Sequence, residues 1–201
     1  DRPDRHVLQS MLLRSLSQAY YDVKNEGHFG LAFDAYTHFT SPIRRYPDLM
    51  VHRLLQKVLS KHEVSADEQK SYEAAVTHCS ITERRADDAT REVMSWLKCE
   101  FLMDKVGNTY PGVITTVTSF GFFVELKDIY VDGLVHVSNL KNGYYEYDAM
   151  RHRLVAENTG VVHAMGDEVE VQVARVDLDQ RQIDFELISH ESSVRKRRKR
   201  K

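Results

Sequence analysis

The feature that most constrains the fold is a change in hydrophobic spacing near residues 105–109. Before this point apolar side chains recur every three or four residues, which is typical of helices packed along one side. After it they alternate with a period of two, which is typical of half-buried strands. The sequence therefore predicts an α+β chain, with a helical region over residues 1–106 followed by a β region over residues 107–190.

Three helices are expected in the first region. An amphipathic pattern covers residues 7–23, and a second helix runs from Asp48 to about Leu59, after Pro47, a residue suited to the first turn. Ser65 and Glu68 form a capping-box pattern at the start of a long third helix that ends near Gly107.

Five short strands are expected in the second region, and a long insertion separates the third strand from the fourth. The strands lie at residues 113–117, 122–126, 131–140, 169–173 and 183–187, and the insertion at 139–166. In the first strand, Val113, Thr115 and Val117 fall on one face. This pattern predicts a five-stranded antiparallel OB-type barrel. The insertion is rich in Tyr, Asn and His and is expected to be its most mobile part.

The charge is unevenly distributed. The whole chain has a net charge of −2. Its last seven residues are all basic, so residues 1–194 carry −9, because −2 − 7 = −9. These residues are Arg195, Lys196, Arg197, Arg198, Lys199, Arg200 and Lys201. We interpret residues 191–201 as a disordered basic tail that meets phosphates, with a solubilising tail or an address signal as the alternative.

No apolar run reaches membrane-spanning length, and no signal segment opens the chain, so a soluble, cytoplasmic protein without a membrane partner is expected. Cys79 and Cys99 lie in one predicted helix, about 30 Å apart, too far for a disulfide. The chain begins with Asp1 and helix-like sequence follows at once, which indicates a piece of a longer polypeptide or a processed terminus.

A loop with two adjacent arginines is the most informative segment. Residues 38–53 read HFTSPIRRYPDLMVHR, so Arg44 and Arg45 follow a proline-stiffened turn and precede a helix start. Guanidinium groups bind phosphate oxygens in a two-pronged manner, and the Ser41 hydroxyl adds a donor. Pairing of both arginines with acids such as Asp48 is the alternative. His38 and His52 lack a ligand pattern and are interpreted as structural.

A second candidate surface lies on the barrel. The period of two places Phe122, Val124 and Leu126 on one face and Phe123 on the other. An outward Phe is costly unless a partner covers it, and stacking on a base contributes roughly 1–3 kcal/mol. The alternative is that the insertion or a neighbouring domain covers Phe123. His136 alone would be interpreted as structural.

The run HFTSPIRRYPDL, preceded by GHFGL and Tyr36, resembles the last conserved block of the RNB catalytic domain of the ribonuclease II/R family. The resemblance implies a processive, Mg²⁺-dependent hydrolase that degrades RNA from the 3′ end to nucleoside 5′-monophosphates. It implies that Arg44 is catalytic, at the scissile phosphate, and that Tyr36, Ser41 and Arg45 bind RNA.

The family holds its metal on closely spaced aspartates, which residues 1–37 do not supply. Their aspartates are Asp1, Asp4, Asp22 and Asp34. The ligands are therefore expected upstream, and no cofactor is expected in these 201 residues. Without a metal there is no activated water, so we expect this chain alone to bind RNA but not to cut it.

Residues 112–138 resemble the S1-type RNA-binding module. Its RNA-facing positions correspond here to Phe120, Phe123, His136, Asp177 and Arg181, and Phe122 departs from the pattern because a smaller residue is common there. The tyrosine-bearing insertion and the ending RQIDFEL favour the ribonuclease R branch of the family. The two resemblances together cover about residues 7–190.

The resemblance implies a monomer that binds single-stranded RNA, including 3′ overhangs of structured RNA, with contacts to the ribosome or to RNA-degradation machinery. Two other classes remain open. One is a non-catalytic RNA-binding module of a translation or ribosome-associated factor, and the other is a scaffold that binds proteins. The SPIRRYPDL loop favours the enzyme, because a binding module has no use for it.

Overall fold

The computed structural model describes residues 9, 12–13, 15–141 and 143–191. The chain forms two compact units. We call Leu16–Arg91 the helical unit, and Glu92–Lys201 together with Asp1–Ser15 the barrel unit. Helix α3 (Ala66–Met103) contributes its first part to the helical unit and its end to the barrel unit.

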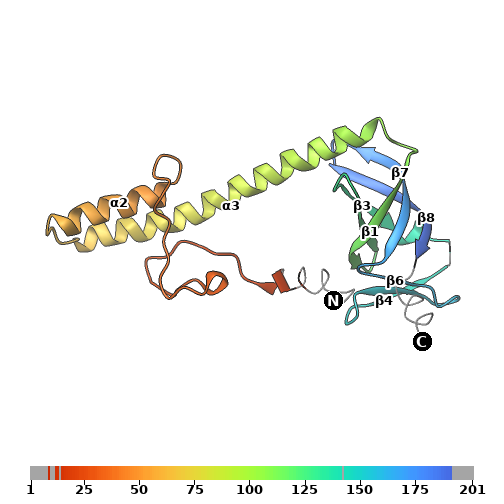
Figure 1. Cartoon of the computed structure of the whole chain (residues 1–201), viewed down its shortest axis with the longest axis horizontal. Helices are drawn as coiled ribbons and strands as arrows, with labels where there is room; N and C mark the ends of the chain where they lie inside the picture. The colour runs from red at the N-terminus through yellow and green to blue at the C-terminus, as the bar shows by residue number, and fades with distance from the viewer. Residues whose placement is uncertain (1–8, 10–11, 14, 142, 192–201) are drawn as a thin grey trace. The chain divides into compact units, whose positions relative to one another are not determined.

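The helical unit contains a short 3-10 helix, η1 (Phe29–Leu31), then helix α2 (Tyr46–Leu59) and the first part of α3. Helices α2 and α3 lie side by side, and Lys57 and Glu68 form an ion pair between them (Figure 1). The capping box is confirmed, because the Ser65 N–H donates to Glu68 Oε2 at 3.1 Å and the Glu68 N–H donates to Ser65 Oγ at 3.3 Å.

The predicted helix over residues 7–23 is wrong beyond Ser15. The described residues up to Ser15 are helical, but residues 17–27 have no regular structure. A tertiary contact explains the difference, since the Tyr21 N–H donates to the side chain of Ser80 at 2.9 Å instead of to a carbonyl one helical turn earlier.

The barrel unit is built on a closed five-stranded barrel with the order β1-β2-β3-β8-β7. The strands are β1 (Thr109–Thr118), β2 (Gly121–Leu126), β3 (Asp132–His136), β7 (Glu168–Asp177) and β8 (Gln182–Glu191). Five strands and an insertion after the third were predicted and are present. The expectation of a wholly antiparallel barrel is wrong, because β3 and β8 run parallel. Strand β3 runs in the direction of β1, because both are antiparallel to β2. Strand β8 also runs in the direction of β1, because both are antiparallel to β7.

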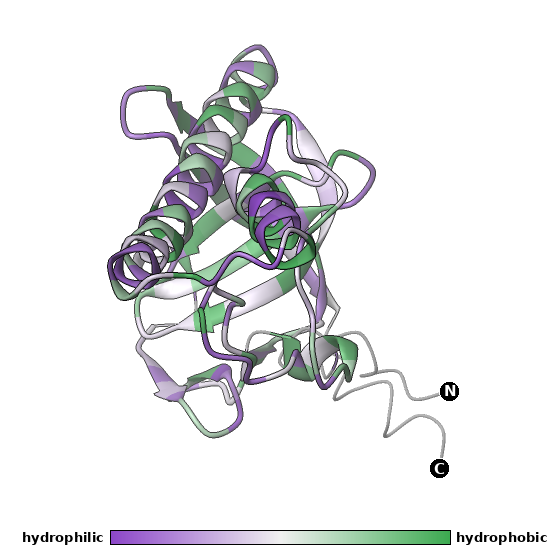
Figure 2. Cartoon of the chain, turned by 90° about the vertical axis from the view of Figure 1, so that its left-hand side faces the viewer, coloured by the Kyte–Doolittle hydropathy of each residue, from purple (hydrophilic) through white to green (hydrophobic). Residues whose placement is uncertain are grey.

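Alternating side chains fill the barrel. Phe122, Val124 and Leu126 are fully buried, as predicted. In β1 the buried residues are Gly112, Ile114 and Val117. The expectation of one shared face is confirmed for Val117 and wrong for Val113 and Thr115, because an irregularity between Ile114 and Thr116 shifts the register with β2. Figure 2 shows apolar stretches, coloured green, along the barrel strands.

The end of α3 belongs to the same core. Cys99 and Leu102 are buried among the barrel residues, with exposed fractions of 1 % and 0 %. This part of the helix therefore packs against the barrel as a structural element and is more than a connection to it.

The insertion forms a small antiparallel sheet that the sequence did not predict. Its strands are β4 (Tyr145–Asp148), β5 (Arg153–Ala156) and β6 (Val162–Ala164), in that order, preceded by the 3-10 helix η2 (Val137–Asn139). Leu154 is fully buried in the barrel core, which ties this sheet to the barrel.

No helix among the described residues is both long and apolar enough to cross a bilayer.

Candidate functional site

The two-arginine loop is a tight turn held by one buried carboxylate. The Ser41 carbonyl accepts the N–H groups of Arg44 at 3.2 Å and Arg45 at 2.9 Å. Asp48, in the first turn of α2, accepts the Ser41 N–H at 2.7 Å and Arg45 Nη2 at 2.9 Å, both on Oδ2. Asp48 is fully buried, so the turn, the arginine and the helix start are fixed together.

The two arginines have different surroundings. The Arg45 side chain is mostly buried on Asp48, as the ion-pair alternative anticipated, whereas Arg44 is exposed. Within the described part of the chain, the Arg44 guanidinium makes no hydrogen bond or ion pair. Arg44 is therefore available to an anion, and Arg45 holds the loop that carries it.

The environment of Asp48 keeps it charged. Burial alone would raise the pKa of this carboxyl group, but the bonds from the Ser41 N–H and Arg45, together with the Arg45 charge, lower the pKa below its ordinary value of 3.8. Two atoms of the pair, Arg45 Nε and Asp48 Oδ1, are buried and have no hydrogen-bond partner among the described residues.

An aromatic and imidazole cluster precedes this loop. The Tyr36 ring lies 5.2 Å from the His28 ring, 6.0 Å from the Phe33 ring and 5.8 Å from the His38 ring, measured between centroids. Tyr36 remains 48 % exposed. The predicted residues Tyr36, Ser41, Arg44 and Arg45 therefore all lie in the helical unit.

Sequence reasoning missed Tyr21, which fixes His38. The Tyr21 hydroxyl lies 2.8 Å from His38 Nδ1 and donates to Glu83 Oε1 at 3.3 Å. Burial, followed by the Glu83 charge, raises the pKa of Tyr21 to about 12, so it remains a neutral donor. Tyr21 falls inside the predicted first helix, and its position there gave no sign of this contact.

His52 is structural, as interpreted from its spacing, because its Nε2 bonds to the Phe39 carbonyl at 2.8 Å and its ring stacks on Phe39. Among the described residues, no group of three or more His, Cys, Asp or Glu side chains is placed to hold a metal ion.

On the barrel, strand pairing gathers a second set of predicted residues. Gly121 pairs with His136, and Phe123 lies two residues along β2, so His136 and Phe123 share the outer face. Phe120 is 46 % exposed, and its ring meets that of Phe123 edge-on at 6.3 Å. Gly121 is required here, because a Cβ atom would lie 2.3 Å from the Val135 carbonyl and its φ is +155°.

The hydrogen bonds of His136 determine which of its ring nitrogens carries the proton. Nδ1 accepts the Ser138 N–H at 3.2 Å and also lies 2.7 Å from Ser138 Oγ. A nitrogen that accepts a backbone N–H carries no proton, so neutral His136 carries its proton on Nε2. The residue is exposed, and Nε2–H can donate to a ligand on the outer face.

Asp177 and Arg181 flank the turn between β7 and β8. Asp177 accepts the Gln180 N–H at 2.9 Å and Arg175 Nη2 at 2.6 Å, and these bonds lower its pKa, the backbone bond most strongly. Arg181 Nη1 donates to Glu92 Oε2 at 2.9 Å. Asp177 thus shapes the turn, whereas Arg181 presents a partly exposed guanidinium.

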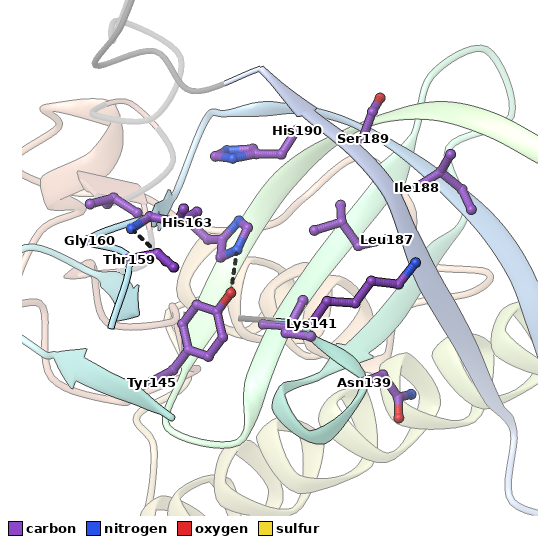
Figure 3. A pocket seen from close by; sticks show the side chains of 13 residues that line it. Asn139, Lys141, Tyr145, Thr159, Gly160, His163, Leu187, Ile188, Ser189 and His190 are labelled. Carbon is purple, nitrogen blue, oxygen red and sulfur yellow. Dashed lines mark hydrogen bonds between the residues drawn. The ribbon is translucent and has the colours of Figure 1, made fainter. Parts of the chain in front are cut away.

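A cavity of about 470 Å³ lies where the insertion meets β8 (Figure 3). Tyr145, His163, Lys141 and His190 line it, and none of the predicted site residues does. His163 is 1 % exposed, and burial, followed by the His190 charge, lowers its pKa to about 4, although the Asp167 charge opposes this shift. In the sequence, His163 stands alone between Val162 and Ala164, as in an ordinary strand. Nothing in this pattern indicated that His163 lines a cavity.

The basic tail, Arg195–Lys201, lies outside the described residues. Its expected contact with phosphates therefore stays a prediction.

Two family models match the chain. One, described as the RNB domain, matches residues 1–61, and the other, described as the S1 RNA binding domain, matches residues 103–188. These matches agree with the two resemblances found in the sequence and follow the same order.

Curated relatives named Ribonuclease R match almost the whole chain. The Escherichia coli (strain K12) protein is 53 % identical, with 97 % of this chain and 25 % of that protein covered. The Vibrio cholerae protein is 50 % identical with the same shares, and the Aquifex aeolicus protein is 44 % identical, with 93 % and 27 % covered. The chain thus spans about a quarter of the length of these relatives.

Two solved structures of one relative are similar to this chain. The apo form of Mycoplasma genitalium RNase R has a TM-score of 0.85 and 30 % identity, covering 94 % of this chain and 30 % of that one. The same protein in complex with ribose methylated single-stranded RNA has a TM-score of 0.85 and 29 % identity, with the same shares covered.

Proposed function

Because the chain belongs to the ribonuclease R family, we propose that it is part of a processive 3′-to-5′ exoribonuclease that hydrolyses RNA to nucleoside 5′-monophosphates. The observation that carries this proposal is the turn at Ser41–Arg45, where a buried Asp48 fixes Arg45 and leaves Arg44 exposed. A fold that only bound RNA would not need a guanidinium held on so rigid a support.

Arg44 is the proposed catalytic residue. Its planar fork of donors matches two phosphate oxygens and would stabilise the charge that develops on the scissile phosphate. Arg45 and Ser41 act through the turn, and the exposed ring of Tyr36 offers a stacking surface beside it. Tyr36 would thus contact RNA directly, whereas the proposed RNA-binding roles of Ser41 and Arg45 are indirect, through the turn that they hold.

The barrel supplies a second set of proposed RNA contacts. Phe120 and Phe123 stack on bases, His136 donates from Nε2, and Arg181 binds phosphate, while Asp177 holds the turn that carries Arg181. The M. genitalium relative is in complex with ribose methylated single-stranded RNA. We propose the same class of partner here, including the 3′ overhangs of structured RNA.

The proposal extends to the organisation of the protein. Residues 1–106 would be the end of the catalytic domain, 107–190 the S1-type domain, with the end of α3 as its helical support, and 191–201 a basic tail. The parent enzyme would be a cytoplasmic monomer that uses Mg²⁺. Its ligands would lie upstream of this chain, because the aspartates of residues 1–37 lack the close spacing that the family uses.

The test is Arg44→Ala in a full-length ribonuclease R that carries this sequence. We expect kcat to fall about 100-fold or more, the scale of a missing transition-state donor, while RNA affinity changes by less than about threefold. Arg44→Lys keeps the charge and removes the fork, so it should bind RNA as the parent does without restoring full activity. Equal losses of kcat and affinity would make Arg44 a binding residue only.

A separate experiment addresses the 201 residues alone. Incubated with oligo(U) and Mg²⁺, they should bind the RNA and release no mononucleotides, because the metal-holding carboxylates are not among them. Release of uridine 5′-monophosphate under these conditions would contradict this part of the proposal.

A further inference from the structure

An acidic residue of α3 forms an ion pair with one of the proposed RNA-binding arginines. Arg181 Nη1 donates to Glu92 Oε2 at 2.9 Å, and both side chains are partly exposed, Arg181 by 43 % and Glu92 by 61 %. The two residues are 89 positions apart and lie in the same compact unit. Their contact is therefore a product of the fold and not of local sequence.

The backbone of Arg181 belongs to a hydrogen-bonded turn. Arg181 has a φ of +54°, a left-handed backbone conformation that residues other than glycine rarely adopt. The turn before it is closed by the hydrogen bond from the Gln180 N–H to Asp177. Rotation of its side chain is enough for Arg181 to change its partner.

Helix α3 is fixed on the other side of the contact. Cys99 lies seven residues after Glu92, two helical turns along the same face, and is buried in the barrel core. Lys98 adds an ion pair to Asp132 of β3 at 3.2 Å. Figure 1 shows the end of α3 beside the barrel. The helix backbone that carries Glu92 is thus held against the barrel.

We propose that Glu92 competes with an RNA phosphate for Arg181 and thereby sets the affinity and salt dependence of the barrel for RNA. The inference rests on the proposed RNA-binding role of Arg181. An exposed ion pair is weak, so a phosphate can displace Glu92. The displaced carboxylate then lies close to the phosphate as a like charge, and both effects reduce the net gain from binding.

The experiment measures binding of the 201-residue chain to a fluorescent oligo(U) of about twelve nucleotides, by anisotropy over a series of salt concentrations. Glu92→Gln should tighten binding about two- to fivefold at low salt, the range expected for one exposed ion pair. The gain should shrink as salt screens both interactions.

The matched control is Glu100→Gln. Glu100 is an exposed residue of the same helix and loses the same charge, but within the described chain it forms no ion pair. If Glu92 acts only through net charge, both substitutions will tighten binding equally, and the competition is refuted. If Glu92 competes for Arg181, only Glu92→Gln gives the full gain.

A double-mutant cycle separates this inference from the proposed function. Arg181→Ala should weaken binding, and in that background Glu92→Gln should add no more than Glu100→Gln does. If Arg181→Ala binds RNA as tightly as the parent chain, Arg181 is not an RNA contact and the competition falls with it. If Arg181→Ala weakens binding but Glu92→Gln matches the parent, the RNA-binding role stands and the competition alone is wrong.

Discussion

Arg45 donates to a fully buried carboxylate, with its Nη2 atom 2.9 Å from Oδ2 of Asp48. The same oxygen accepts the Ser41 N–H, so one atom joins the turn to the first helical turn of α2. The two adjacent arginines of the motif therefore have different tasks. Arg45 holds the turn, and Arg44, which has no side-chain partner among the described residues, can meet a ligand.

We predict that Asp48→Asn destabilises the helical unit, because the neutral amide leaves the partly buried Arg45 charge without its partner. The melting temperature at pH 7, followed by circular dichroism, should fall by several degrees. Asp87→Asn is the control, since Asp87 is exposed on α3. Equal effects of the two substitutions would show that the Arg45–Asp48 contact does not hold the loop.

Asp48 also predicts a pH dependence. Its folded pKa lies below the unfolded value near 3.8, so its contribution to stability is complete above that value and is lost as the pH falls through the folded pKa. The stability difference between the parent chain and Asp48→Asn should therefore narrow below about pH 4. A difference that stays constant down to about pH 2.5 would contradict the assignment of the charged form.

We predict that His163 makes the stability of the barrel depend on pH over a different range. Its pKa is about 4 in the folded chain and near 6.5 when unfolded, so between these values the unfolded state binds the extra proton. Barrel stability should fall as the pH is lowered from 6.5 to 4, by up to about 3 kcal/mol from this group. His163→Phe cannot titrate and should remove this part of the slope, whereas His136→Gln, at an exposed position, should keep it.

The measurement for His163 is urea unfolding at about pH 7 and about pH 4.5, on either side of the unfolded pKa, followed by the fluorescence of Trp96, the only tryptophan. Trp96 lies in the barrel unit, so its signal reports the right part of the chain. Parallel losses of stability in His163→Phe and in the parent would show that other groups cause the slope.

Substitutions at Leu102 test how much α3 contributes to the stability of the barrel. Leu102→Ala should cost about 2–5 kcal/mol of unfolding free energy, because it opens a cavity in a packed core. Met103→Ala, at the neighbouring exposed position, should cost much less. A piece of the chain that starts at residue 107 lacks both Cys99 and Leu102 and should melt well below one that starts at residue 92. Equal melting temperatures would show that the helix is dispensable.

The basic tail predicts an electrostatic effect that does not depend on RNA sequence. Removing Arg195–Lys201 should weaken binding to all single-stranded RNAs alike and reduce the salt slope by about 0.7 for each phosphate that the tail neutralises. Replacing the seven residues by glutamines keeps the length and should have the same effect. If RNA affinity depends on tail length and not on its charge, the interpretation fails.

Sequence patterns predicted the elements that depend on local rules. The capping box at Ser65 and Glu68 marked the start of α3, and alternation located Phe122, Val124 and Leu126 in the core. Local rules failed where distant residues decide the structure. Tyr21 bonds to Ser80 and interrupts the predicted first helix, and the irregularity after Ile114 shifts the inward residues of β1.

The candidate site shows the same division. The motif identified Arg44 and Arg45 together, but only the burial of Asp48 separates their roles. The S1-type pattern placed Arg181 at the RNA-facing surface, yet its partner Glu92 lies 89 positions away and gives no sequence signal. The small sheet of the insertion was missed because its strands have only three or four residues each.

The parallel pairing of β3 with β8 has a consequence for how the barrel is assembled. Leu134 pairs with Asp184, which lies fifty residues later in the chain. The β3–β8 pairing can therefore form only after nearly all of the strands have been synthesised. Until β8 arrives, β3 has an open edge and the sheet cannot curl shut. The nascent chain would thus close the barrel only in the last step of folding, once β8 has been made.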